Sequence, residues 1–193
     1  MLFLGHAGIG TRLLKPISRA LPLGWTIFGT LLPDLIDKPL YYGLSFVTGL
    51  RGEALGLISG TRTLGHTAIL LVCVTLFAVV RRSPKVAGIA LGMATHLFLD
   101  GFGDYWDASE TRPARQALLF PLLGAHFAHY PFQDLGDHLQ TSLTSQYNLW
   151  GEALGGTFLA WELWLRDRMK VKLNAPLTAV RERIRRRRRG KRT

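Results

Sequence analysis

Apolar residues gather into blocks that polar or basic segments separate, and this pattern organises the whole chain. Alternation with a period of two is weak, and no Asn-Gly hairpin signal occurs, so the pattern favours helices over strands. It predicts an all-α fold whose main helices lie in residues 1–20, 21–37, 64–80, 86–100, 116–130 and 149–165. Residues 38–63 and 101–115 are mixed or polar, and residues 131–148 are predicted to be a loop.

The same blocks predict a helical membrane bundle of about four to five transmembrane or membrane-embedded helices. Blocks 64–80, 86–100 and 149–165 are shorter than the roughly 20 residues that a membrane span needs, but basic and tryptophan residues flank them as anchors. The alternative is a soluble or peripheral bundle in which these are buried helices. The composition, 48% hydrophobic and 19% charged, favours the membrane bundle.

The charge is distributed unevenly and suggests two parts. Residues 1–166 are predicted to form a single membrane domain, and residues 167–193 a basic tail that includes Arg185 to Arg189. Much of the net charge of +11 lies in this tail. We expect membrane lipids as partners, with anionic headgroups at the tail, because each basic residue near such a surface contributes about 1 kcal/mol. Nucleic acid is not expected as a partner.

Basic residues also predict an orientation. The groups Arg12/Lys15/Arg19 and Arg81/Arg82/Lys85 should face the cytoplasm together with the C-terminus. The block at 116–130, which contains a proline and histidines, should not cross fully. The only cysteine, in the apolar block 64–80, excludes an intrachain disulfide and a Cys-based zinc site. We therefore expect a multi-pass protein of a prokaryotic plasma membrane.

This orientation brings polar side chains from four helices to one depth, toward the outer face. Ionisable groups inside a membrane are costly and usually functional. His96 and Asp100 are spaced i, i+4 and share one helix face. Because nitrogen and oxygen ligands suit zinc first, and manganese, iron or magnesium next, we expect one or two divalent ions. The candidate ligands are His6, Asp34, Asp37, His66, His96 and Asp100.

Each candidate also has a structural alternative. Asp34 follows a proline and could belong to a turn, Asp37 could pair with Lys38, and His66 could begin a helix. His6 alone could lie in a frayed terminus. Three further histidines are interpreted as surface residues: His126, His129 and His138. The alternative for His126 and His129, spaced i, i+3, is that they join a site.

Several short segments resemble a known family when they are taken in order. They are GHAGIG (5–10), GTLLPDLIDKPL (29–40), RTLGHT (62–67), HLFLDGFGDYW (96–106) and ALLFPLL (117–123). They resemble the membrane-bound metal-dependent hydrolases, also described as LexA-binding inner-membrane hydrolases, which are distantly similar to zinc-dependent phospholipase C. The resemblance implies that His66, His96 and Asp34 ligate one metal, and that Asp100 bridges to a second metal held by His6. It also implies a regulatory protein partner.

The expected function is therefore a membrane-bound hydrolase that cleaves a phosphoester, of a lipid or lipid-linked phosphate, with metal-activated water. Asp37 would act as general base or orient a histidine, and Arg62 would bind substrate phosphate. One alternative is a non-enzymatic binding or regulatory protein with a structural metal, and another is a transporter component. The chain lacks a Walker loop, a dinucleotide fingerprint and a G-x-S-x-G elbow.

Overall fold

The computed structural model describes residues 2–16, 21–106, 113–128, 132 and 134–189. These residues form α-helices and two short 3₁₀ turns, without a strand among them, which confirms the prediction of an all-α fold. The helices are α1 (Phe3–Leu14), α2 (Leu23–Thr48), α3 (Ala68–Arg81), α4 (Pro84–Trp106), α5 (Pro113–Leu118), α6 (Leu135–Thr144) and α7 (Gln146–Arg189). The 3₁₀ turns are η1 (Gly52–Leu55) and η2 (Leu64–His66).

Helices α2 and α4 form the centre of the bundle and pack side by side, backbone against backbone. A Cβ atom added at Gly29 would lie 2.3 Å from the carbonyl oxygen of Ile89. One added at Gly92 would lie 2.4 Å from the carbonyl oxygen of Thr26. Only glycine allows such an approach, so the small residues of both helices set their separation.

Helices α1 and α7 pack in parallel along a second close contact. A Cβ atom at Gly8 would lie 1.8 Å from the carbonyl oxygen of Gly155. The Glu152 carboxylate accepts hydrogen bonds from the first turn of α1, at 2.9 Å from the Leu4 nitrogen and 2.8 Å from the Gly5 nitrogen. A carboxylate at a helix N-terminus satisfies free N–H groups and complements the helix dipole. The start of α1 is thereby held in place beside α4.

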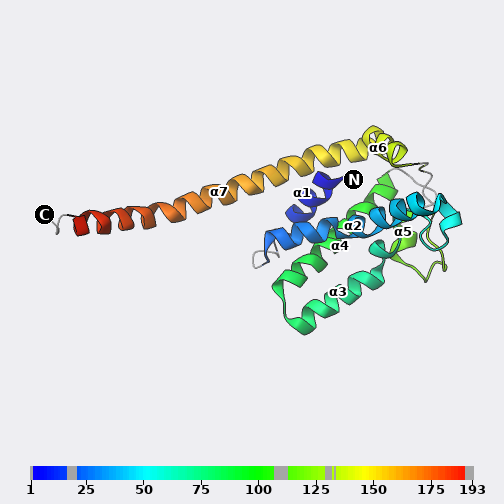
Figure 1. The fold of residues 1–193 in the computed structure, drawn as a ribbon, viewed down its shortest axis with the longest axis horizontal. Helices are drawn as coiled ribbons and strands as arrows, with labels where there is room; N and C mark the ends of the chain where they lie inside the picture. Colours follow the sequence, from blue (N-terminus) through cyan, green and yellow to red (C-terminus); the bar gives the residue numbers. More distant parts are fainter. Residues whose placement is uncertain (1, 17–20, 107–112, 129–131, 133, 190–193) are drawn as a thin grey trace.

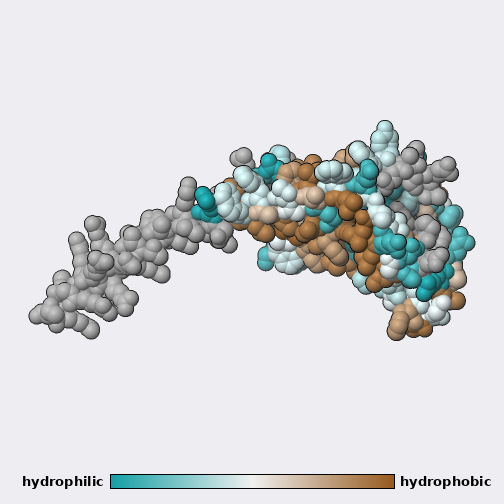
Figure 2. Space-filling view, turned by 90° about the horizontal axis from the view of Figure 1, so that it is seen from above, coloured by the Kyte–Doolittle hydropathy of each residue, from teal (hydrophilic) through white to brown (hydrophobic). Residues whose placement is uncertain are grey.

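Helix α3 returns along α4 and turns an apolar face outward. Side chains on it are 52–77% exposed, namely Ile69, Val72, Leu76, Phe77, Val79 and Val80. Among the described helices only α4 is long and apolar enough to cross a membrane, and α3 is apolar but shorter. This does not confirm the predicted bundle of four to five membrane helices. Figure 2 shows apolar residues gathered over the middle of the molecule, with a polar region at the end away from the α7 extension.

Several element boundaries differ from the sequence prediction. Helix α4 continues to Trp106, into the polar segment 101–115 that lies outside the predicted helices. Helix α2 continues to Thr48 although Pro33 and Pro39 lie inside it, because packing against α4 outweighs the two lost N–H donors. The block at 116–130 contributes only the end of α5, followed by turns. Helix α7 runs through the predicted boundary between the membrane domain and the basic tail and extends beyond the bundle (Figure 1).

The predicted loop at 131–148 contains helix α6 and the start of α7. The Asp134 carboxylate caps α6 by accepting a hydrogen bond from the Asp137 nitrogen at 2.9 Å. Leu135, Leu139 and Leu143 recur every four residues on one exposed face of this helix. The cap and this period are the sequence signals that could have identified α6.

Candidate metal centre

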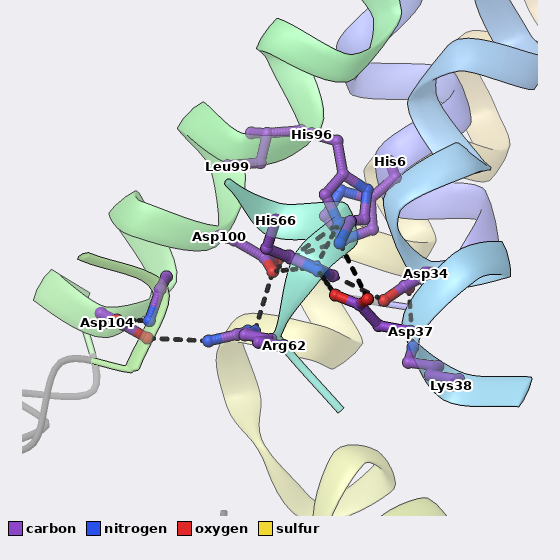
Figure 3. Close-up of polar contacts among 12 residues, drawn as sticks. His6, Asp34, Asp37, Lys38, Arg62, His66, His96, Leu99, Asp100 and Asp104 are labelled. Carbon is purple, nitrogen blue, oxygen red and sulfur yellow. Dashed lines mark hydrogen bonds and ion pairs between the residues drawn. The ribbon is translucent and has the colours of Figure 1, made fainter. Parts of the chain in front are cut away.

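The six predicted ligand residues lie together, and all are buried (Figure 3). They come from four elements in different parts of the chain. Helix α1 contributes His6, α2 contributes Asp34 and Asp37, η2 contributes His66, and α4 contributes His96 and Asp100. The predicted convergence of these residues therefore occurs in the folded chain.

Five of these side chains direct ligand atoms toward a common centre. The His66 Nε2 atom lies 3.1 Å from His96 Nε2, 3.4 Å from Asp100 Oδ2 and 3.7 Å from Asp34 Oδ1. The His6 Nε2 atom lies 3.4 Å from Asp100 Oδ1. Atoms bound at about 2.0–2.2 Å to one ion lie about 3–3.5 Å apart. The spacing of the nitrogen and oxygen atoms thus suits a divalent ion.

Two of the histidines are oriented through their other ring nitrogen. The His96 Nδ1 atom lies 2.7 Å from the carbonyl oxygen of Thr30, and a carbonyl can only accept a hydrogen bond. The His66 Nδ1 atom lies 2.7 Å from Asp37 Oδ2. With Nδ1–H donating in both rings, each Nε2 atom presents its lone pair to the common centre, as metal-binding histidines do.

Asp37 lies behind His66, away from the common centre. Its two oxygens also accept hydrogen bonds from the Thr63 nitrogen at 2.6 Å, the Thr63 hydroxyl at 3.0 Å and the Gly65 nitrogen at 2.8 Å. The carboxylate is completely buried and has four donors around it. This geometry favours Asp34 over Asp37 as a ligand and gives Asp37 the role of orienting His66.

His6 completes the group from the α1 side. Its ring stacks on that of His96, with centroids 3.9 Å apart and planes at 19°. Its Nδ1 atom is buried and has no hydrogen-bond partner among the described residues. Among the described residues, His6 thus lacks the second hydrogen bond that orients the rings of His66 and His96, and the stack on His96 positions its ring instead.

Two cations hold the ligand carboxylates. The Lys38 ammonium lies 2.6 Å from Asp34 Oδ2, one helical turn away on α2. The Arg62 guanidinium lies 2.9 Å from Asp100 Oδ2 through Nε and 2.9 Å from Asp104 Oδ1 through Nη1. Arg62, predicted to bind substrate, is thus already engaged with two carboxylates. Lys38 and Asp104 were missed as site residues, although each follows a predicted ligand by four positions.

A cavity of about 110 Å³ borders the cluster. The carboxylates of Asp34 and Asp100 line one side of it, with Lys38 and Arg62 beside them. The corner where α6 meets α7 lines the opposite side. Part of the ligand set is therefore accessible from this cavity rather than enclosed on all sides.

His138, interpreted from the sequence as a surface residue, also lines this cavity. Its Nδ1 atom lies 2.7 Å from the Tyr42 hydroxyl, and its ring stacks on Phe132 at 4.1 Å. Burial, with Lys38 nearby, lowers the pKa of His138 to about 4. The imidazole is therefore neutral at neutral pH.

Two histidines remain, His126 and His129. The side chain of His126 is exposed in the turns after α5, away from the six candidate ligands. His129 lies outside the described residues.

Comparison of the chain with family models, with curated proteins and with solved structures found no match in any of the three. Functional inference therefore rests on the residues of the site and on the cavity beside them.

Proposed function

We propose that this chain is a membrane-embedded, metal-dependent hydrolase of phosphoesters, related to the membrane-bound metal-dependent hydrolases. One observation carries the proposal: a buried cluster of three histidines and two aspartates borders a polar cavity. Structural metal sites are closed by protein ligands, whereas catalytic sites keep an accessible position. The cavity favours the catalytic alternative.

The proposed ligands are His6, Asp34, His66, His96 and Asp100, which offer nitrogen and oxygen only. Such a set suits zinc first, and manganese, iron or magnesium next. One or two divalent ions there would supply a Lewis acid for a phosphoryl oxygen and lower the pKa of water toward neutrality.

The remaining residues position these ligands and the substrate. Asp37 and the Thr30 carbonyl oxygen fix the rings of His66 and His96. Asp37 does not line the cavity, which favours the orienting role over that of a general base. Lys38 and Arg62 line it and carry N–H donors for phosphate oxygens, and Arg62 also holds Asp100.

The membrane part of the proposal is supported by the surface of the bundle. Helix α4 has the length and composition of a membrane span, and α3 exposes an apolar face beside it. The end of α1, the start of α2 and the α3–α4 turn lie at the same end of the bundle, toward the α7 extension (Figure 1). Basic residues gather at that end, so we propose that it faces the cytoplasm and the metal centre faces outward.

Hydrolysis of bis(p-nitrophenyl) phosphate by detergent-purified protein tests the proposal. We expect turnover that needs added zinc or manganese and that falls at least about 100-fold in His96→Ala. His126→Ala is the matched control, because it removes an exposed histidine outside the cluster, and should keep full activity. Turnover equal in His96→Ala and wild type, or absent with every metal, would overturn the proposal.

A non-enzymatic protein with a structural metal is the second candidate. The observation that favours it is that both cations beside the cavity already form ion pairs, Lys38 with Asp34 and Arg62 with Asp100 and Asp104. Stoichiometric metal without turnover would select this candidate.

A further inference from the structure

Much of the rest of the cavity wall consists of uncharged polar side chains. Ser142 and Ser145 come from α6 and the residue after it, Asn148 from the first turn of α7, and Thr61 from the segment before η2. None of them contributes to the proposed ligand set. The wall is therefore a separate surface that a molecule in the cavity would contact.

Two of these residues are buried, yet they border the cavity. Ser142 is 7% exposed and Thr61 is 3% exposed, and both line the cavity. Neither hydroxyl is among the atoms that the protein encloses without a hydrogen-bond partner, so both remain accessible from the cavity. The half-buried Asn148 carboxamide also lines it. Hydroxyl and amide groups that face a cavity suit a ligand that carries hydroxyls of its own.

This wall is anchored to the helices that bear the metal ligands. The contact of His138 with Tyr42, at 2.7 Å, ties α6 to α2. The Tyr147 hydroxyl donates a hydrogen bond to the Leu99 carbonyl oxygen at 2.6 Å and ties α7 to α4. The hydroxyl and amide groups are thus held at a fixed distance from the ligand cluster, as a specific binding site requires.

With the proposed divalent ion bound, the charges of the cavity disfavour an ammonium group. Three carboxylates and two cations line it, Lys38 beside Asp34 and Arg62 shared by Asp100 and Asp104, so a divalent ion makes the sum of these charges positive. A positive site repels choline or ethanolamine. A phosphate group, in contrast, would find further N–H donors on Lys38, next to the charge of Arg62.

We propose that the cavity binds the phosphate of a hydroxyl-bearing alcohol, such as a glycerol or sugar phosphate. The phosphate lies at Lys38 and Arg62, next to the ligand cluster. The alcohol hydroxyls bind Thr61, Ser142 and Asn148. This placement rests on the proposed function, because the phosphate is the group to be cleaved. The polyol phosphate is either a soluble molecule or the headgroup of a lipid.

Calorimetric titration of the detergent-purified protein tests this specificity with three probes: glycerol 3-phosphate, phosphocholine and inorganic phosphate. We expect glycerol 3-phosphate to bind about tenfold tighter than inorganic phosphate, because its hydroxyls add hydrogen bonds to the polar cavity wall. Phosphocholine should bind no tighter than inorganic phosphate. Equal or tighter binding of phosphocholine than of glycerol 3-phosphate overturns the inference, and so does the absence of binding by all three.

Two variants locate the effect on the wall. Ser142→Ala and Asn148→Leu should each weaken glycerol 3-phosphate at least about threefold and leave inorganic phosphate unchanged, which also reports an intact fold. Thr144→Ala is the matched control, because this α6 hydroxyl is exposed, bonds to the Gln140 carbonyl oxygen and does not line the cavity. Wild-type affinity for glycerol 3-phosphate in both wall variants overturns the inference.

The binding assay and the hydrolysis assay test the two proposals independently, so either proposal can be refuted without the other. Selective binding of glycerol 3-phosphate without turnover of bis(p-nitrophenyl) phosphate refutes the hydrolase and keeps the polyol site. Turnover without selective binding refutes the polyol site alone. Mixed micelles that contain phosphatidylglycerol or phosphatidylcholine identify the source of the ligand. Displacement of glycerol 3-phosphate by phosphatidylglycerol alone identifies a lipid headgroup, and no displacement identifies a soluble polyol phosphate.

Discussion

The two ends of the bundle place charged residues in different surroundings. At the candidate metal centre, cations pair with buried carboxylates, as Lys38 does with Asp34. At the other end, cations lie over aromatic rings, Arg12 over Phe158 at 5.8 Å and Lys85 over Trp25 at 5.9 Å. The ion pairs at that end, from Lys15 and Arg166 to Glu162, are more exposed. Buried ion pairs must be complete to be stable, whereas cations on exposed rings keep their water.

This difference sets the size of the effects that we expect at each end. Four of the five proposed ligands make a second hydrogen bond or ion pair, so a single change there should spread to metal binding. The aromatic end suits contact with a membrane surface, where basic and aromatic residues anchor helices individually. Changes at that end should stay local and small.

The largest expected effect concerns the residue behind His66. Asp37→Asn keeps the proposed ligands but weakens the hydrogen bonds that orient the His66 ring and the loop around Thr63. We expect metal affinity to fall about 10–100-fold, as for other partners of metal-bound histidines. Competition with a chelator measures this. Glu53→Gln, an exposed change of the same size, should have wild-type affinity. A metal affinity of Asp37→Asn equal to that of the wild type would contradict the orienting role of Asp37.

The comparison of the two ends is tested by one substitution at each. In metal-free protein, Lys38→Gln leaves the buried Asp34 carboxylate without its cation and should lower stability by roughly 1–3 kcal/mol. Lys85→Gln removes only an exposed cation–π contact and should cost less than about 1 kcal/mol. Thermal unfolding in detergent measures both. Equal costs would show that the ends do not differ as described.

The support beneath the metal centre is the glycine contact of α2 with α4. Gly92→Ala places a methyl group 2.4 Å from the Thr26 carbonyl oxygen and should destabilise the protein by about 1–3 kcal/mol. Gly101→Ala on the same helix meets no atom within 4 Å, so its better helix propensity should raise stability by up to about 1 kcal/mol. Midpoints of thermal unfolding that shift in the same direction for both would contradict this packing.

The last expected effect, absent at neutral pH, is a pH dependence from His138. Its pKa is lowered to about 4 in the folded chain, from an ordinary value of 6.5, so the unfolded chain binds more protons between these values. Stability contributed by the neutral ring is complete above pH 6.5 and is lost as the pH falls toward 4. His138→Gln should flatten this part of the stability curve. Parallel curves for the variant and the wild type would exclude the contribution.

Much of the ligand set could be predicted from sequence because it depends on local spacing. His96 and Asp100 share a helix face by their spacing alone, and basic residues indicated which block ends lie at one depth. The choice between Asp34 and Asp37 could not be predicted, because it depends on how the segment at 62–67 folds over α2.

The cavity wall was missed for a different reason. Helix α6 is short and polar, so the apolar blocks did not include it. The position of His138 depends on long-range contacts with Tyr42 and Phe132, which no sequence period records. Boundaries also shifted where packing outweighed local signals, as at Pro39 inside α2.

The central claim is that His6, Asp34, His66, His96 and Asp100 hold a divalent ion. The most direct measurement is elemental mass spectrometry with X-ray absorption on purified protein, wild type beside His96→Ala and His126→Ala. We expect one to two ions per chain in wild type and His126→Ala, with nitrogen and oxygen neighbours at about 2.0–2.2 Å, and loss of metal in His96→Ala. No metal after reconstitution with zinc and manganese, or equal metal in His96→Ala, would contradict the claim.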